Sequence, residues 1–172
     1  EELLHEQVAF GTERTMEQDP MFSFRILVDI AAKALSPAIN DPTTAVLAID
    51  QLHRLLRLVG RRDLRAEEIA DDTGEVRLIV RTPNWEDFVH IVFREIRLFG
   101  AGNLQIPRRL AAVIENLVQT LPEHRNAALR TELELLDRAI AEHYSYPEDL
   151  ALARMPDPQG MGGSSRSQSA GR

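Results

Sequence analysis

Hydrophobic residues recur at steps of three and four along most of this chain, which is the spacing of one face of an α-helix. The clearest apolar stripe consists of Trp85, Phe88, Val89, Val92, Phe93, Ile96 and Phe99. An earlier stripe consists of Phe24, Leu27, Ile30, Ala31, Ala34 and Leu35. Helices are predicted near residues 1–10, 20–35, 41–59, 83–100, 104–121 and 122–144. The pattern therefore predicts a mainly α fold, a helical bundle of about five or six helices.

The helical period is lost between residues 64 and 82. Asp71-Asp72-Thr73-Gly74 is a turn signal, and the short β-branched run that ends at Val80 follows it. We therefore predict one small β-hairpin here. From Pro147 the composition changes, and residues 160–172 are rich in glycine and serine. These boundaries predict a helical domain over 1–146 and a flexible tail over 147–172.

The candidate functional site is the connection between the first two long helices. Two Asp-Pro pairs, Asp19-Pro20 and Asp41-Pro42, each begin an apolar helix. The start of a helix has unpaired N–H groups and a positive dipole, so it can receive an anion. Polar residues at this connection and on the helix before it would then form a small pocket for an anionic ligand. The candidates are Arg14, Arg25, Asp29, Lys33, Ser36, Asn40, Asp41, Thr43 and Thr44.

A structural interpretation of the same residues is simpler, and base rates favour it. Asp41 would cap its own helix and thereby occupy the position of the anion. Arg25, Asp29 and Lys33 are four residues apart, so they would form a ladder of ion pairs along one helix. Arg14 would be an exposed loop charge.

Composition excludes several functions. The formal net charge of −7 argues against nucleic-acid binding, and the absence of cysteine excludes disulfides and thiolate chemistry. The five histidines lie on five different segments, and no catalytic motif is present. We therefore predict no catalytic residues, no metal site and no cofactor. No apolar run reaches the roughly 18 residues that a membrane-spanning helix needs. Because the chain begins at Glu1 without methionine, we expect a fragment or a processed chain.

Two helices carry a second row of apolar residues outside their main stripe. Leu47, Leu55 and Leu58 form this row between residues 41 and 59, and Ile91 and Leu98 lie seven apart in the Trp85 helix. Either both helices are central in the bundle, or these rows form an interface between copies of the chain. The second alternative predicts a homo-oligomer.

A resemblance to a known family is carried by a long motif that contains ALSPAINDPTTA. DDTGEVRLIV, TPNWEDFV, IRLFGAGN and DPQGMGG carry it further along the chain. These residues resemble a bacterial family of predicted membrane proteins with no assigned function (domain of unknown function 2254). The resemblance implies transmembrane helices before this region in the full-length protein. It also implies that this chain is a soluble portion on the cytoplasmic side of the cell membrane.

Two functions follow as hypotheses. The first is a non-enzymatic assembly or regulatory domain that works with the membrane-spanning part of the same protein. The alternative is a sensor of a small anionic ligand, or an enzyme, with its site at residues 36–44.

Overall fold

The computed structural model describes residues 19–64, 67–80 and 82–159. Over these residues it contains six α-helices, one 3-10 turn and one two-stranded hairpin, which confirms the predicted fold class. The helix expected within residues 1–10 lies outside the described residues. In chain order the elements are α2 (Pro20–Ala34), α3 (Pro42–Val59), β1 (Glu67–Ala70), β2 (Val76–Val80), α4 (Trp85–Gly100), α5 (Gln105–Thr120), η1 (Glu123–Arg125), α6 (Asn126–His143) and α7 (Pro147–Ala153).

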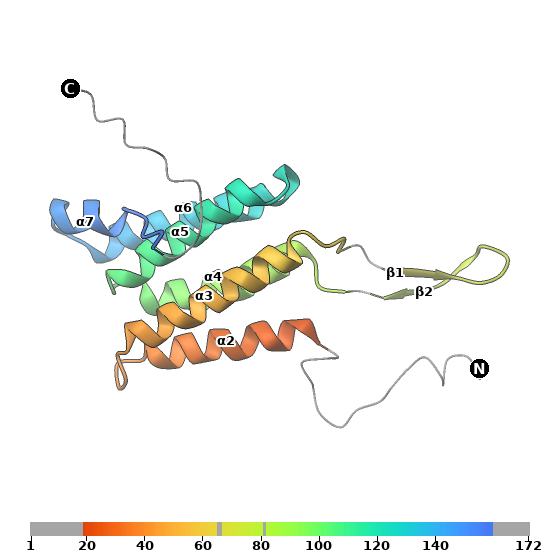
Figure 1. The fold of residues 1–172 in the computed structure, drawn as a ribbon, viewed down its shortest axis with the longest axis horizontal. Coiled ribbons are helices and arrows are strands. Elements are labelled where there is room, and N and C mark those ends of the chain that lie inside the picture. The colour runs from red at the N-terminus through yellow and green to blue at the C-terminus, as the bar shows by residue number, and fades with distance from the viewer. Residues whose placement is uncertain (1–18, 65–66, 81, 160–172) are drawn as a thin grey trace.

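Helices α3 and α4 form the middle of the bundle (Figure 1). Helix α2 packs against both of them on one side, while α5 packs on α3 and α6 packs on α4 on the other. Helices α2 and α4 run in the same direction. Phe24 meets Phe88 near their starts, and Leu35 lies beside Gly100 at their ends. The connection between α2 and α3 therefore lies at one end of the bundle, and the hairpin leaves from the other.

The core is contributed by every long helix. Its largest fully buried side chains are Trp85, Phe24, Phe93, Ile49, Leu52, Leu56, Ile96, Ile106, Leu110, Ile114, Leu117 and Leu129. Ile30 and Phe99 belong to the predicted apolar stripes but do not lie in the core. Ile30 is 43% exposed and Phe99 is 58% exposed. Phe99 is one residue before Gly100, where a Cβ would collide with Ile106. The last turn of α4 buries the side that faces α2 and α5. Phe99 belongs to the predicted apolar stripe but lies outside this buried side.

Helix α4 begins with a capping box. The Asn84 side chain accepts a hydrogen bond from the Asp87 N–H at 2.9 Å, and the Asp87 carboxylate accepts one from the Asn84 N–H at 3.0 Å. The last long helix was predicted to begin at Pro122, but α6 begins at Asn126 after the 3-10 turn. Arg125 is the last residue of this turn, and its guanidinium stacks on the ring of Trp85 at 5.6 Å from the ring centroid.

Residues that had been assigned to the tail extend the bundle. Residues 147–153 form α7, which packs on α5 and α6 and buries Ala153. The chain then crosses α5, where Arg108 donates to the Met155 carbonyl at 3.0 Å. Contacts with the bundle therefore continue past residue 146 in the described part of the chain, and the division into a domain and a tail stays a prediction.

Candidate functional site at the connection between α2 and α3

The two Asp-Pro pairs begin helices as the sequence indicates. The Asp19 carboxylate accepts a hydrogen bond from the Met21 N–H at 3.0 Å, and Pro20 is the first residue of α2. The Asp41 carboxylate accepts hydrogen bonds from the N–H of Thr44 at 3.1 Å and from the Thr44 hydroxyl. These bonds lower the pKa of Asp41 below its ordinary value, with the hydroxyl bond as the larger cause. Each aspartate thus stabilises the start of its own helix.

A compact turn brings the end of α2 to the start of α3. The N–H groups of Ile39 and Asn40 both donate to the Ser36 carbonyl, at 3.0 and 2.9 Å. Asn40 has φ of +48°, a left-handed conformation that asparagine tolerates better than most residues. The N–H of Asp41 then donates to the Ala34 carbonyl at 2.8 Å. The carbonyls at the end of α2 are therefore satisfied by the connection itself.

The charged residues on α2 are directed partly toward α4. Arg25 donates to Glu95 of α4 through two nitrogens, the longer bond being 3.1 Å, and its Nε lies 3.0 Å from Asp29. Lys33 is exposed near the end of α2, where its carbonyl accepts from the Ser36 hydroxyl at 2.7 Å. The expected ion pair between Arg25 and Asp29 is therefore present. Arg25 also pairs with Glu95 of α4, a contact that the sequence did not indicate.

The predicted residues do not all meet at one point. Asn40, Asp41, Thr43 and Thr44 gather at the start of α3, whereas Arg25 and Asp29 lie further back along α2. Arg14 lies outside the described residues. The Asp41 carboxylate occupies the position that an external anion would take, which favours the structural interpretation. The described residues contain no group of three histidine, aspartate or glutamate side chains that could hold a metal ion.

A buried arginine lies away from this connection. Arg109 of α5 is 6% exposed and donates through Nε to Asp50 of α3 at 2.6 Å. Its Nη1 donates to the carbonyls of Asp157 and Gln159, at 3.2 and 2.6 Å. One guanidinium therefore joins two helices and the C-terminal segment. Sequence reasoning missed this cluster because its members are 48 to 59 residues apart. The only local signal was an aspartate on an otherwise apolar part of α3.

A second buried polar pair joins the same two helices. His53 Nε2 lies 2.9 Å from Asn116 Oδ1, and both residues are buried. Since an amide oxygen only accepts, His53 donates to it from Nε2. Burial lowers the pKa of His53 below its ordinary value, although the bond to Asn116 opposes this.

A third buried group is less completely paired. Glu132 of α6 is 2% exposed, and its Oε2 lies 3.7 Å from Nε of Arg97 on α4. Within the described residues neither of these two atoms has a hydrogen-bond partner. Burial raises the pKa of the Glu132 carboxyl, while the positive charge of Arg97 opposes the shift. The pair holds α4 to α6 by charge rather than by a well-formed bond.

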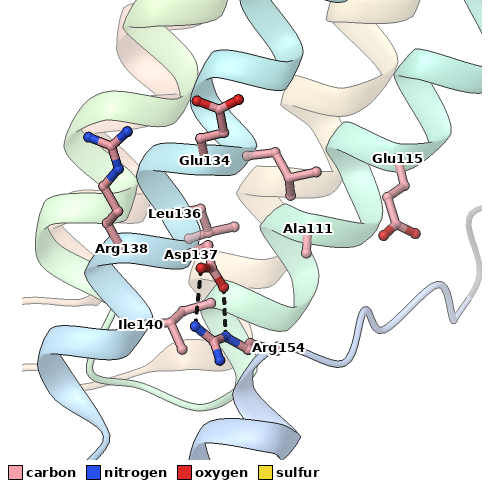
Figure 2. Close-up of a pocket in the computed structure, with 9 residues that line it drawn as sticks. Ala111, Glu115, Glu134, Leu136, Asp137, Arg138, Ile140 and Arg154 are labelled. Carbon is pink, nitrogen blue, oxygen red and sulfur yellow. Dashed lines mark hydrogen bonds and ion pairs between the residues drawn. The ribbon is translucent and has the colours of Figure 1, made fainter.

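An open groove of about 530 Å³ lies between α5 and α6 (Figure 2). Apolar side chains such as Ala111, Leu136 and Ile140 line it together with charged ones. Arg154 of α7 donates to both carboxylate oxygens of Asp137, at 2.6 and 3.1 Å. The other charged residues of the lining, Glu115, Glu134 and Arg138, are also of both signs.

The fold and these contacts define a helical domain with a projecting hairpin and polar clusters that connect its helices. The chain belongs to the family described as predicted membrane protein (DUF2254), whose model matches residues 1–116. The resemblance that the motifs carried is thereby confirmed. Among the described residues, no helix combines the length and the apolar character that crossing a membrane requires.

Relatives of the chain are uncharacterized proteins. One from Mycobacterium bovis and one from Mycobacterium tuberculosis are each 32% identical to it over 149 residues. The match covers 84% of this chain but 28% of each relative, so the chain spans a little over a quarter of their length. No solved structure matches the chain.

Replacing Asp41 tests the two interpretations of the connection. Asp41→Ala removes the acceptor for the Thr44 N–H, so its urea midpoint should fall, whereas Asp41→Asn should retain most of the stability because asparagine also caps helices. Added millimolar phosphate should leave the wild-type midpoint unchanged. A phosphate-dependent rise in the wild-type midpoint would instead support an anion site.

His53 should make folding stability depend on pH. Its pKa is lower in the folded chain, so the unfolded chain binds more protons below the ordinary value of 6.5. Stability should therefore fall as pH decreases from about 7.5 to about 5.5. The part of this loss of folding stability that comes from His53 should be absent in His53→Gln. Urea titrations at the two pH values measure it. His124→Gln, at an exposed position, is the control, and equal pH slopes in wild type and His53→Gln would contradict the assignment.

Proposed function

We propose that this chain is a non-enzymatic assembly or regulatory domain of an integral membrane protein and that copies of it associate. The observation that carries the proposal is the exposure of large apolar side chains on α3 and α4. Leu47 and Leu58 on α3 are 59% and 57% exposed, and Leu98 and Phe99 on α4 are 66% and 58% exposed. Burying one such side chain contributes roughly 1.5 to 3 kcal/mol.

The residues within the two apolar rows differ in how exposed they are. Leu55 and Ile91 are partly buried and pack against the core of the same chain. Leu47, Leu58 and Leu98 belong to the same rows but contact solvent. Complete burial inside one bundle therefore does not account for these three leucines, and a surface on a second copy would cover them.

Membership of a family of predicted membrane proteins supports the proposal that this chain is one domain of an integral membrane protein. The matched region is only 28% of the length of the relatives, so most of each relative lies outside it. Several subunits that meet in a membrane would bring their remaining domains together, and this domain would then hold or regulate the assembly. The anion-sensor alternative gains no comparable support, because Asp41 caps α3.

Leu98→Glu and Leu47→Glu test association. Wild-type chain at micromolar concentration should show a mass above one chain in light scattering, and each variant should lower that mass because it places a charge in a contact surface. Their thermal unfolding should match wild type, since both side chains are more than half exposed. Met155→Glu, at a residue that is 57% exposed elsewhere, is the matched control. A wild-type chain that stays monomeric over the whole concentration range would exclude the proposal.

The proposal includes a cytoplasmic position for this domain in the full-length protein. Green fluorescent protein folds in the cytoplasm and alkaline phosphatase is active outside it. We expect full-length protein carrying the first reporter after residue 159 to fluoresce and the corresponding phosphatase fusion to be inactive. The reverse pair of results would place the domain on the other side of the membrane.

A further inference from the structure

The hairpin formed by β1 and β2 projects from the bundle (Figure 1), and one of its faces carries exposed apolar side chains. Ile69 lies opposite Leu78 in the antiparallel register, and Val76 is two residues before Leu78 on the same face. These three side chains are 47%, 42% and 44% exposed. A two-stranded hairpin is marginally stable by itself, and both of its edges have unpaired backbone groups. The hairpin therefore has the properties of an element that is completed by another surface.

The hairpin is strongly acidic. Between residues 67 and 80 the chain has five acidic residues and one arginine. Asp71 organises the tip by accepting hydrogen bonds from the Thr73 hydroxyl, from the Thr73 N–H at 2.9 Å and from Arg77 at 2.7 Å. The bond from the Thr73 hydroxyl, followed by that from Arg77, lowers the pKa of Asp71 to about 2. Asp72, beside it, is exposed. A surface that binds this tip should therefore carry positive charge.

A positively charged cleft of about 400 Å³ lies at the root of the same hairpin, between the end of α3 and the η1 turn. Three arginines, Arg61, Arg62 and Arg125, line it together with His124 and one acidic residue, Asp63. Arg125 is held in place because it donates to the carbonyls of Gly60 and Arg62, at 3.3 and 2.9 Å. Arg61 and Arg62 are exposed. The neighbouring stretch 51–62 contains four arginines and no acidic residue, although the whole chain is acidic.

We propose that the acidic tip of the hairpin of one copy binds in the arginine cleft of a second copy, and that the second copy reciprocates. The cleft lies at residues 60–63, just before the hairpin in the chain. A chain cannot fill its own cleft with its own tip, because the hairpin extends away from the bundle (Figure 1). A five-residue strand is about 17 Å long. Two hairpins that lie side by side in opposite directions would bring each tip to the root of the other, which is a two-fold symmetric arrangement.

This arrangement covers apolar surface as well as charge. Leu58, which is 57% exposed, lies in the last turn of α3 just before Arg61 and Arg62. The apolar faces of the two hairpins would lie against each other along the pair, and each tip would come near Leu58 of the other copy as its carboxylates reach the arginines. An anionic lipid surface fits the cleft alone but not the whole region, because it would repel the acidic hairpin attached beside the cleft.

The inference rests on the proposed function, since it names one surface through which the copies associate. Two charge-reversed proteins test it. Asp72→Arg reverses the tip, and the double variant Arg61→Glu with Arg62→Glu reverses the cleft. Each protein alone places like charges together at both contacts, so each should raise the dimer dissociation constant at least tenfold in analytical ultracentrifugation.

An equal mixture of the two reversed proteins should restore association. In the mixed dimer the reversed tip of one chain faces the reversed cleft of the other, and the native Asp72 of the second chain faces the native arginines of the first. Arg130→Glu, an exposed charge reversal on α6, is the matched control and should leave the dissociation constant unchanged. Circular dichroism of every variant should match wild type, since all of the changed residues are exposed.

Crosslinking gives an independent measurement because the chain has no cysteine. Asp72→Cys protein mixed with Arg61→Cys protein should give a covalent dimer with a short bis-maleimide. Asp72→Cys protein alone should not, since the two tips lie at opposite ends of the paired hairpins.

The outcomes separate the two proposals. A monomeric wild type would remove both of them. A wild type that associates but is insensitive to the charge reversals, or reversed proteins whose mixture stays dissociated, would overturn the hairpin inference alone. Wild-type binding to vesicles of phosphatidylserine and phosphatidylcholine, lost on reversing the cleft without any change in mass, would also overturn it and assign the cleft to lipid.

Discussion

The packing of α3 and α4 between α2 on one side and α5 with α6 on the other is the constraint on which the rest of this structure depends. A helix with neighbours on two sides must bury more than one narrow stripe. Ala45 and Ala48 allow close approach on α3, while Leu52 and Leu56 fill the space between layers. Only the remaining sector of each helix faces solvent, and that sector carries Leu47 and Leu98. The exposed leucines proposed for association are therefore on the sectors that the packing of the middle layer leaves uncovered.

The polar groups inside this packing have a common arrangement. Arg109 with Asp50 and His53 with Asn116 both connect α3 to α5, while Arg97 with Glu132 connects α4 to α6. Each pair thus lies between the middle layer and the α5–α6 layer. Breaking a buried pair is costly because the remaining partner stays buried without compensation. These pairs fix how the two layers are placed, and Arg109 extends that control to the segment at residues 155–159 through its carbonyl contacts.

What could be predicted from the sequence was local. Asp19 and Asp41 cap their helices because an aspartate followed by proline has the acceptor and the backbone angle that a helix start needs. The hairpin was signalled by the loss of helical period around Gly74, whose φ of +81° suits glycine. The capping box of Asn84 with Asp87 is equally local, but it was not predicted, and the helix was expected to begin at residue 83 instead of Trp85. Helix α7 was obscured by the proline and glycine around it, and its formation depends on packing against α5 and α6.

What could not be predicted depends on which helices meet. Arg25 was placed in a ladder along α2, yet its strongest contact is with Glu95 of α4, 70 residues away. The same limit applies to the arginine cleft. Arg61 and Arg62 are close in sequence, but His124 and Arg125 join them only because α6 begins beside the end of α3. The folded chain thus brings four basic side chains next to the root of an acidic hairpin. Since opposite charges that cannot meet within one chain can meet between two, this arrangement is what the proposed association would use.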